Sequence, residues 1–462
     1  MIPAQELVER GVAAADAAGA DACIVLVEEG SHADVRFAQN TTTTNGVHRA
    51  RSVSVVMMAA GSVGTSRRTG VVGTAGVDDM VAAALADARE APPAEDAFPL
   101  VEPWGDTLGR DFGLAPEETD SRVLEGVLSS LSGAFGRARA RDAVLAGFAE
   151  LDVTTLYLGS STGLRLSHLQ PTGAVNLVGR TTDGKGSAWV GEPSITPSLE
   201  DMEREIWRRL DWAKRQVSLE AGRYEVILPP SGVGDMMAEL AFGGLGGRDA
   251  EDGRTVFSKE GGGTRAGDRI ASLPFTLFSD PFEAGVECAP FVAAEASSSE
   301  VSVFDNGLPV RRVDWLHEGV LAHLRYHRAG AAKSGVEVAP YIDNLVLHCA
   351  GAAGGSVDDM VARTERGLLL TCLWYIREVD PATLLLTGLT RDGVYVIEDG
   401  AVVGAANNFR FNESPVDLLA RASEVGTPVR ALGREFGEYL NRSIMPPLRI
   451  PDYNMSSVSQ AS

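Results

Sequence analysis

The chain is poor in cysteine, in lysine and in long apolar stretches. It has 462 residues with 4 Cys, and its formal net charge is −22, from 63 acids against 41 bases. Proteins that coat DNA or RNA need a basic surface that replaces phosphate counterions. The longest strongly apolar run, residues 368–376, is far shorter than the ~20 residues of a membrane-spanning helix. We therefore expect neither a nucleic-acid partner nor a membrane partner.

The few cysteines and the N-terminal residues indicate in which cellular compartment the protein is expected. The cysteines form no CxxC pair, which is typical of reduced thiols in a cytosolic protein; they are Cys23, Cys288, Cys349 and Cys372. The first residues, MIPAQELVERG, combine acids with an amphipathic pattern, unlike a secretory signal or a basic transit peptide. Together these features predict a cytoplasmic protein.

The first half of the chain alternates helical and extended patterns. Apolar spacing predicts helices over 3–18, 78–91 and 118–139, and strands over 22–27, 35–38 and 53–58. Residues 143–191 contain short apolar runs separated by glycine, which is typical of a β-meander. A further helix is expected from Pro197 to about Val217, where Ser198 and Asp201 have the spacing of a capping box.

The second half consists mainly of strand patterns. Residues 223–228 predict a strand that ends at Pro229-Pro230, and a helix is expected over 231–243. Most segments between 270 and 405 are extended, with hairpin turns predicted at Asp305-Asn306-Gly307, Glu318-Gly319, Asp392-Gly393 and Asp399-Gly400. Helices are predicted again over 415–423 and 429–441, and the tail from Pro446 is expected to be irregular.

These patterns predict an α+β protein of two parts. An N-terminal α/β domain is expected over residues 1–220 and includes the meander at 143–191. A β-rich C-terminal domain with a few helices is expected over residues 221–462. The boundary falls between the helix that ends near Val217 and the strand that begins at Arg223.

One candidate nucleophile has the spacing of a hydrolase motif. Residues 159–163 match GxSxG, which would make Ser161 the nucleophile of an α/β-hydrolase. That mechanism requires a strand, a strained turn and then a helix. Residues 164–168 instead alternate like a returning strand, so we interpret the motif as a β-hairpin turn. A serine hydrolase acting through Ser161 remains a lesser hypothesis.

A cluster of histidines suggests a metal site at first sight. His317-Glu318 is followed by His323 and His327, whereas a zincin motif needs a second His four residues after the first, where Leu321 stands. The surrounding pattern is that of a hairpin, in which residues four apart lie about 13 Å from each other. We therefore interpret these residues as surface histidines.

Several stretches, taken in order along the chain, carry a family resemblance. They are Arg36–Asn40 (RFAQN), Ser161–Gly163 with the strands that follow, Tyr224–Pro230 with the helix after it, Ala331–Gly335, Val396–Gly400 and Asn408–Phe411. Together they resemble the TldD/PmbA family of bacterial peptidase-related proteins, over nearly the whole chain. Their order and spacing carry the resemblance, because none of them is diagnostic alone.

The resemblance implies a zinc motif that is degenerate in this chain. TldD-like members carry HExxxH on the helix that corresponds to 231–243, a downstream Cys completes the zinc site, and the motif Glu is the general base. Here Ala238 and Gly243 stand at the two His positions, and neither side chain can donate an electron pair to zinc. Glu239 keeps the general-base position and Cys372 falls near the third ligand position, so both are candidate relics of a pseudo-active site.

The resemblance therefore points to the TldE/PmbA-like kind of member. Such a chain is expected to pair with a TldD-like subunit, or with a second copy of itself. It should be inactive alone and hold no metal or cofactor, with zinc in the partner subunit. It would help bind and admit small or unstructured peptides for proteolysis. The alternative is an autonomous metallopeptidase with an unorthodox site made of Glu239, Cys372 and one or more of His317, His323 and His348.

Overall fold

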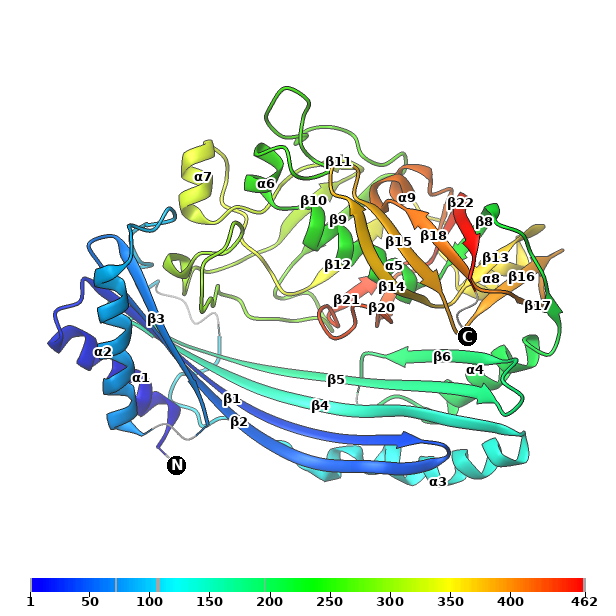
Figure 1. The fold of residues 1–462 in the computed structure, drawn as a ribbon, viewed down its shortest axis with the longest axis horizontal. Helices are drawn as coiled ribbons and strands as arrows, with labels where there is room; N and C mark the ends of the chain where they lie inside the picture. Colours follow the sequence, from blue (N-terminus) through cyan, green and yellow to red (C-terminus); the bar gives the residue numbers. More distant parts are fainter. Residues whose placement is uncertain (1, 71–72, 105–108, 195, 460–462) are drawn as a thin grey trace.

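The chain folds as an arched sheet that faces a second body of strands (Figure 1). The computed structural model describes residues 2–70, 73–104, 109–194 and 196–459. Within these ranges the strands form three sheets; helices flank the first sheet, and one helix, residues 230–239, packs against strands of both other sheets. The α+β fold class predicted from the sequence is confirmed.

Four long strands form the arch. They are β1 (Ala22–Ala38), β2 (Thr41–Ala59), β4 (Ala143–Ser160) and β5 (Arg165–Thr181). With β3 (Ser62–Thr69) and β6 (Ser187–Glu192) they pair antiparallel in the order β3-β2-β1-β4-β5-β6. The predicted strands 22–27 and 35–38 are two parts of the continuous strand β1. The β4–β5–β6 succession is the predicted meander, and its first turn joins Gly159 to Arg165 across the GxSxG stretch.

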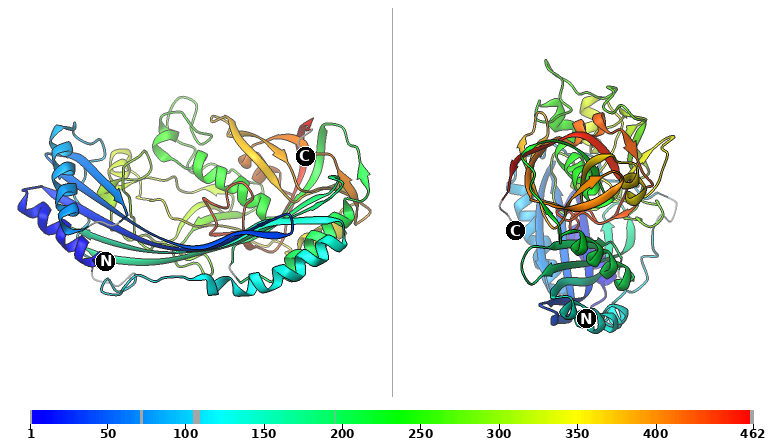
Figure 2. Two further views of the ribbon diagram at one scale, coloured as in Figure 1. Left: turned by 60° about the horizontal axis from the view of Figure 1, so that its bottom comes forward. Right: turned by 90° about the vertical axis from the view of Figure 1, so that its right-hand side faces the viewer.

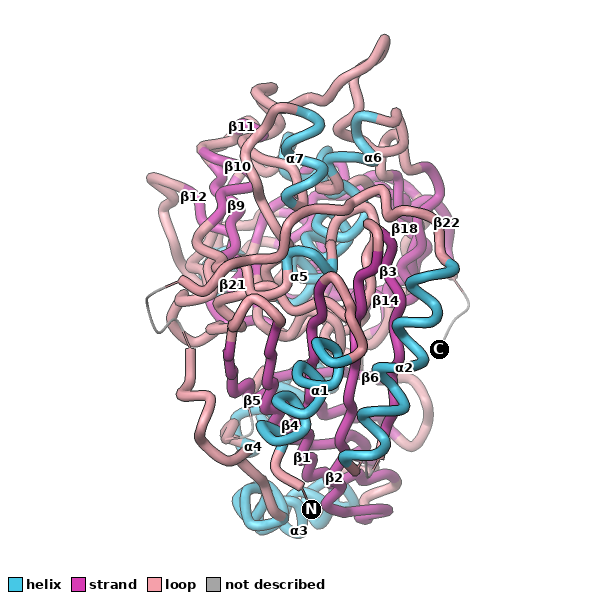
Figure 3. The backbone as a smooth tube through the Cα atoms, turned by 90° about the vertical axis from the view of Figure 1, so that its left-hand side faces the viewer, coloured by secondary structure: helices cyan, strands magenta, loops and turns pink. Residues whose placement is uncertain are grey.

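Helices cover the two ends of the arch. α1 (Ala4–Ala17) and α2 (Thr74–Glu90) lie side by side at one end (Figure 3). A 3-10 turn (Ser121–Leu124) leads into α3 (Glu125–Ala140), which packs with α4 (Leu199–Trp212) towards the other end. The Ser198 hydroxyl accepts a hydrogen bond from the Asp201 backbone N–H at 3.2 Å, which confirms Ser198 as the predicted helix cap. The helix α4 ends at Trp212, five residues before the expected Val217.

The second half of the chain forms two further sheets. One has the order β11-β10-β9-β12-β21-β20, with β9 (Phe275–Ser279), β10 (Val313–His317), β11 (Val320–Leu321), β12 (Leu345–Cys349), β20 (Val429–Ala431) and β21 (Ser443–Met445). The other has the order β14-β15-β18-β22-β8-β13-β16-β17-β7, and β19 (Glu424–Val425) pairs with β22. Its strands are β7 (Gln216–Val217), β8 (Gly222–Leu228), β13 (Arg366–Leu370), β14 (Leu373–Asp380), β15 (Leu385–Thr390), β16 (Val394–Glu398), β17 (Ala401–Ala406), β18 (Phe409–Glu413) and β22 (Leu448–Val458).

One helix occupies the centre of this second body. α5 (Pro230–Glu239) continues into a π-helical turn (Leu240–Gly244), and the strands curve round it (Figure 2, right). Pro230 stands at the start of the helix, where the missing N–H of proline costs nothing. Residues 232–238 are all buried, because α5 packs within the largest apolar core of the protein. The shorter helices are α6 (Gly247–Glu251), α7 (Arg328–Ser334), α8 (Val357–Ala362), α9 (Pro415–Arg421) and a 3-10 turn (Val303–Asp305).

The predicted turns divide into two groups. Glu318-Gly319 joins β10 to β11 and Asp399-Gly400 joins β16 to β17, both with the positive φ angles that such hairpin turns require. The hairpin predicted at Asp392-Gly393 is wrong, because β15 and β16 on either side of it pair with other strands. Asp305-Asn306-Gly307 follows a 3-10 turn and does not join two strands of a hairpin.

The helix predicted over 429–441 is wrong. Residues 429–431 form β20, and residues 434–439 form successive turns. The backbone N–H groups of Arg434, Glu435 and Phe436 donate to the carboxylate of Asp235 instead of bonding within a helix. A tertiary partner has thus overridden the local helical spacing.

The irregular tail predicted from Pro446 is also wrong over its described part. β22 pairs with β8 and β18 inside the large sheet, although it contains Pro451. The proline is tolerated because the register shifts between Ile450 and Tyr453, where Asp452 has a φ of 55°. Residues 460–462 of that predicted tail lie outside the described residues.

Candidate functional site

The degenerate motif lies at the end of the central helix. Ala238 is fully buried in α5, whereas Glu239 and Gly243 are half-buried. The π-helical turn Leu240–Gly244 begins two residues after Ala238 and includes Gly243. In an α-helix, side chains five residues apart diverge by about 140°. A π turn has more residues per turn and narrows this angle, so the backbone keeps a shape suited to a five-residue ligand spacing.

The side chains at these positions do not fit a metal. Ala238 and Gly243 offer no donor atom, and a carboxylate oxygen of Glu378 lies beside Gly243, 3.4 Å from where a Cβ would stand. In the ranges that the structure describes, no group of three His, Cys, Asp or Glu side chains is placed to share a metal ion. A zinc ion would need three or four such ligands.

Glu239 faces other acids. Burial, helped by the charges of Glu378 and Glu435 and opposed by that of Arg377, raises the pKa of its carboxyl to about 7. Arg377 is itself engaged, because its Nη1 lies 2.9 Å from Glu435 Oε1. A raised pKa is typical of a general base, and here burial and neighbouring acids account for it without a catalytic role.

Cys372 lies in different surroundings, at the corner between β13 and β14. Its thiol is buried, and burial raises its pKa well above the ordinary value. The charged groups that act on it are Asp392, Arg434, Asp235 and Arg209, and none of these acts on Glu239. A buried thiol of this kind is a poor ligand and a poor nucleophile.

The other candidates from the sequence are not brought together. His317 and His323 both contact Asp314 in the β10–β11 hairpin, through its carboxylate and its backbone oxygen respectively. His327 accepts the Gly330 N–H at the start of α7, and His348 is exposed on β12. Ser161 accepts the Cys23 N–H at 3.1 Å in a hairpin turn, which confirms the hairpin interpretation of GxSxG.

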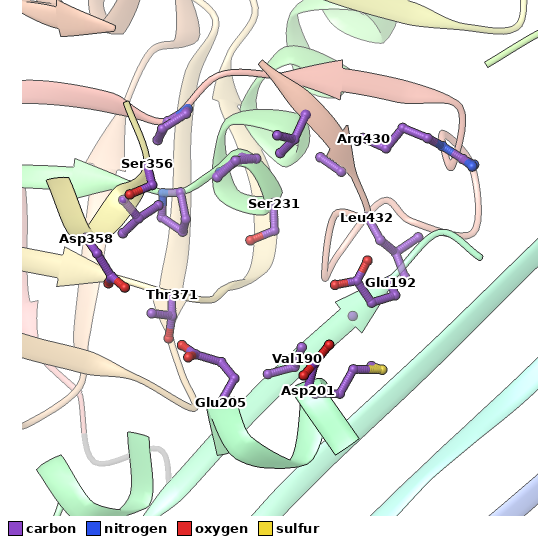
Figure 4. Close-up of a pocket in the computed structure, with 18 of the residues that line it drawn as sticks. Val190, Glu192, Asp201, Glu205, Ser231, Ser356, Asp358, Thr371, Arg430 and Leu432 are labelled. Carbon is purple, nitrogen blue, oxygen red and sulfur yellow. The ribbon is translucent and has the colours of Figure 1, made fainter. Parts of the chain in front are cut away.

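Two cavities lie between the arch and the second body. The first, of ≈ 850 Å³, is bordered by β6 and α4 on one side and by the N-terminal end of α5 on the other (Figure 4). Glu192, Glu205, Ser231 and Thr371 line it, and Arg208 spans it in an ion pair with Asp358 at 2.7 Å. Glu205 is likewise paired with Arg208 and Arg209, so part of the charge on this cavity wall is already neutralised within the chain.

The second cavity, of ≈ 800 Å³, lies beside the degenerate motif. Its floor is formed by β4 and β5 of the arch, with Glu150 and Asp152 on the surface. Its other side is formed by β14 and by residues 432–439, which we call the Arg434 loop. Aromatic side chains of this wall are open to solvent, with Tyr439 69% and Tyr375 55% exposed. A wall that combines aromatic rings with a few charged groups is typical of a ligand cavity.

A buried carboxylate holds the Arg434 loop in place. Asp235 is fully buried in α5, three residues before Ala238. Its oxygens accept the backbone N–H groups of Arg434 at 3.0 Å, Glu435 at 3.1 Å and Phe436 at 2.9 Å. Neither Asp235 nor this loop belongs to a motif that is recognisable in the sequence. The signal for Asp235 was an acid in the otherwise apolar stretch GVGDMMA, where a buried charge requires partners.

The comparisons with known proteins agree with this architecture. Residues 221–457 match the family model described as the PmbA/TldA metallopeptidase C-terminal domain. The chain is therefore a metallopeptidase-related protein. The chain belongs to the PmbA/TldD family. No curated protein matches the chain significantly.

Solved structures show the same fold over the whole chain. TldE from Thermococcus kodakarensis superposes with a TM-score of 0.78 at 17% identity, over 97% of this chain and 98% of that one. A proposed modulator of DNA gyrase from Bacteroides thetaiotaomicron gives 0.75 at 15% identity, over 98% of each chain. A similar protein from Thermotoga maritima gives 0.74 at 15%, over 97% of this chain and 99% of that one. No helix among the described residues has both the length and the apolar character of a membrane span.

Proposed function

We propose that this chain is the non-catalytic subunit of a zinc metallopeptidase complex, in which it binds extended peptides while a TldD-like partner cleaves them. The observation that carries the proposal is the pair Ala238 and Gly243. Gly243 lies in a π-helical turn and Ala238 just before it, beside a Glu with a raised pKa, yet neither residue offers an atom that binds zinc. The likeness to a TldE structure supports a subunit of this kind.

The second cavity supports the peptide-binding part of the proposal. A volume of ≈ 800 Å³ accommodates a few residues of an extended chain and excludes a folded domain. The open edge of β14 borders it, but the Tyr375 N–H already donates to Glu435 Oε2 at 2.9 Å. Because that backbone donor is occupied, the peptide cannot pair fully with β14 as an additional strand. We therefore expect it to be bound mainly by side-chain contacts with Tyr375, Tyr439 and the Arg434 loop.

A mixing experiment tests the proposal. Digestion of casein or an unstructured peptide is followed with this chain alone, with an HExxxH-bearing partner alone and with both, and the metal content of each purified protein is measured. We expect no cleavage by this chain, no stoichiometric zinc in it, and enhanced cleavage in the mixture. A partner with its motif Glu changed to Gln is the matched control and should abolish the activity of the mixture.

The same measurements distinguish the proposed non-catalytic subunit from the alternative, an autonomous metallopeptidase. Stoichiometric metal in the isolated chain, with cleavage that a chelator abolishes, would favour that alternative. Cleavage by the isolated chain that a chelator leaves unchanged would contradict both metal-based hypotheses.

A further inference from the structure

Arg434, on the wall of the second cavity, contacts two indole rings. Its guanidinium carbon lies 5.4 Å from the ring centroid of Trp189, on β6 of the arch, and 4.7 Å from that of Trp374, on β14. Its backbone is fixed as well, because its N–H donates to Asp235. Stacking of this kind fixes the orientation of a guanidinium while leaving its N–H groups free to bond.

No acid neutralises this guanidinium. Across the described ranges no carboxylate lies within ion-pair distance of Arg434, and its Nε is buried without a hydrogen-bond partner. The chain has 63 acids for 41 bases, so an unpaired arginine is not explained by a shortage of acids. The other arginine of the cavity, Arg377, is paired with Glu435. Because Nε has almost no accessible surface, the Nη groups of Arg434 are the donors that face a ligand in the cavity.

A second free donor lies on the floor of the same cavity. Asn176, on β5, is 8% exposed and lines the cavity. Its Oδ1 accepts the Trp189 Nε1–H at 2.9 Å. Its amide nitrogen has no acceptor in the part of the chain that the structure describes. Trp189 thus positions two donors at once, the Asn176 amide through a hydrogen bond and the Arg434 guanidinium through stacking.

The far end of the cavity has the opposite charge. Phe148 pairs with Asn176 across β4 and β5, and Asp152 pairs with Thr172 four residues along each strand. Four residues correspond to about 13 Å. Glu150 and Asp152 lie towards that end, and Glu438 acts on Glu150 electrostatically. His32 and Arg36 offset part of this negative charge, since His32 Nδ1 lies 2.7 Å from Asp152 Oδ1 and both act on Glu150. An anionic group nevertheless meets three carboxylates at this end and an unpaired guanidinium at the end that holds Arg434.

We propose that Arg434, assisted by Asn176, binds a carboxylate of the peptide that occupies the second cavity, and so selects peptides by their terminal or side-chain carboxylate. The inference rests on the proposed peptide-binding function. A planar guanidinium matches a carboxylate in a two-bond geometry, which gives specificity as well as affinity. The carboxylate comes either from a peptide C-terminus or from an Asp or Glu side chain, and the test distinguishes these two sources.

The test measures binding of fluorescein-labelled pentapeptides by fluorescence polarisation, with the full chain alone and with its partner. Three versions of one neutral sequence are compared: a free C-terminus, an amidated C-terminus, and an amidated C-terminus with one central Glu. We expect the free-carboxylate or the Glu peptide to bind roughly 10- to 100-fold more tightly than the amidated neutral one, the effect of a hydrogen bond to a charged group. Preference for the free C-terminus identifies the terminal group as the ligand, and preference for the Glu peptide identifies the side chain.

Variants assign the effect to the proposed residues. Arg434→Gln should abolish the preference for a carboxylate, and Asn176→Asp should weaken it while still accepting the Trp189 N–H. The matched control is Arg430→Gln, because Arg430 lies on neighbouring β20, lines the first cavity and has no ion-pair partner among the described residues. Near-ultraviolet circular dichroism checks that each variant keeps its tertiary structure.

Two results would overturn the inference: equal binding of all three peptides to the unaltered chain, or an unchanged preference in both Arg434→Gln and Asn176→Asp. The mixing experiment tests the proposed function separately. A chain that enhances cleavage by its partner but ignores carboxylates contradicts this inference alone. A chain that prefers carboxylates but fails to enhance cleavage contradicts the subunit role alone.

Discussion

Asp235 Oδ1 accepts the backbone N–H of Phe436 at 2.9 Å, across a sequence separation of 201 residues. The bond joins the central helix, which carries the degenerate motif, to the loop that lines the second cavity. Two further N–H groups of the same loop donate to this carboxylate. The shape of the cavity wall therefore depends on one buried acid, and this dependence leads to the first prediction.

Asp235→Asn should loosen the Arg434 loop. Asparagine keeps one acceptor oxygen and turns an N–H2 group towards backbone N–H groups, so at least one buried donor loses its partner. We expect a loss of about 2–3 kcal/mol in the free energy of unfolding. Urea unfolding at pH 8 measures the loss, and amide hydrogen exchange should accelerate at residues 434–436. Asp79→Asn, at an exposed position of α2, is the control; unchanged exchange in Asp235→Asn would contradict the anchoring role.

Glu239→Gln should change how stability depends on pH. The pKa of Glu239 is raised from 4.5 to about 7, mainly by burial, so ionisation is less favourable in the folded state than in the unfolded one. The folded chain therefore loses stability as the pH rises from about 4.5 to about 7, and the glutamine variant escapes this loss. After allowance for solvent screening we expect the variant to be more stable by about 1 kcal/mol at pH 8, with little difference near pH 5.

The measurement for Glu239 is urea unfolding at several pH values between 5 and 8. The pKa of Asp235 is also raised to about 7, so its ionisation changes the stability of the unaltered chain and of Glu239→Gln in the same way. The difference in unfolding free energy between these two proteins therefore reports on Glu239 alone. Glu6→Gln, at an exposed position of α1, serves as the surface control. A difference that is constant from pH 5 to pH 8 would argue against a raised pKa at Glu239.

Gly64→Ala should destabilise the arch strongly. A Cβ on Gly64 would stand 2.0 Å from the Ala84 carbonyl oxygen and 2.4 Å from the Ala88 nitrogen, so β3 and α2 would have to separate. We expect a loss of at least about 2 kcal/mol, because the clash is with backbone that cannot rotate away. Gly126→Ala, in α3 with no atom within 4 Å, should instead add about 0.5–1 kcal/mol. Thermal or urea unfolding of both variants tests the pair, and equal effects would contradict the close packing of β3 on α2.

Thiol labelling should distinguish the cysteines of the folded protein. Cys372 is 1% exposed, and burial raises its pKa well above the usual value. Burial also raises the pKa of Cys23 to about 11 and that of Cys288 to about 12, which leaves the half-buried Cys349 as the most accessible thiol. Brief treatment with N-ethylmaleimide followed by peptide mass spectrometry should label Cys349 first.

A control and a contrary outcome complete the labelling experiment. Cys349→Ser should react slowly until urea is added, when all remaining thiols become available. Rapid labelling of Cys372 in native buffer would show that its thiolate is exposed. Cys372 would then again be a candidate metal ligand or nucleophile.

The sequence by itself determined the features that depend on neighbouring residues. The apolar stripe and Ser198 predicted α4, Glu318-Gly319 predicted a hairpin with positive φ angles, and alternation after GxSxG predicted a returning strand. The absence of imidazoles at 238 and 243 was also readable directly, since chemistry that a side chain lacks cannot be supplied by folding.

Only the tertiary structure decided the features that depend on distant partners. β22 is a strand despite Pro451 because β8 and β18 lie on either side of it, and residues 434–436 are turns because Asp235 takes their N–H groups. The second cavity and the pairing of Arg434 with Trp189 and Trp374 exist only where the arch meets the second body. Hydrophobic periodicity and turn chemistry act over a few residues, whereas these contacts join segments far apart in the chain and leave no local pattern.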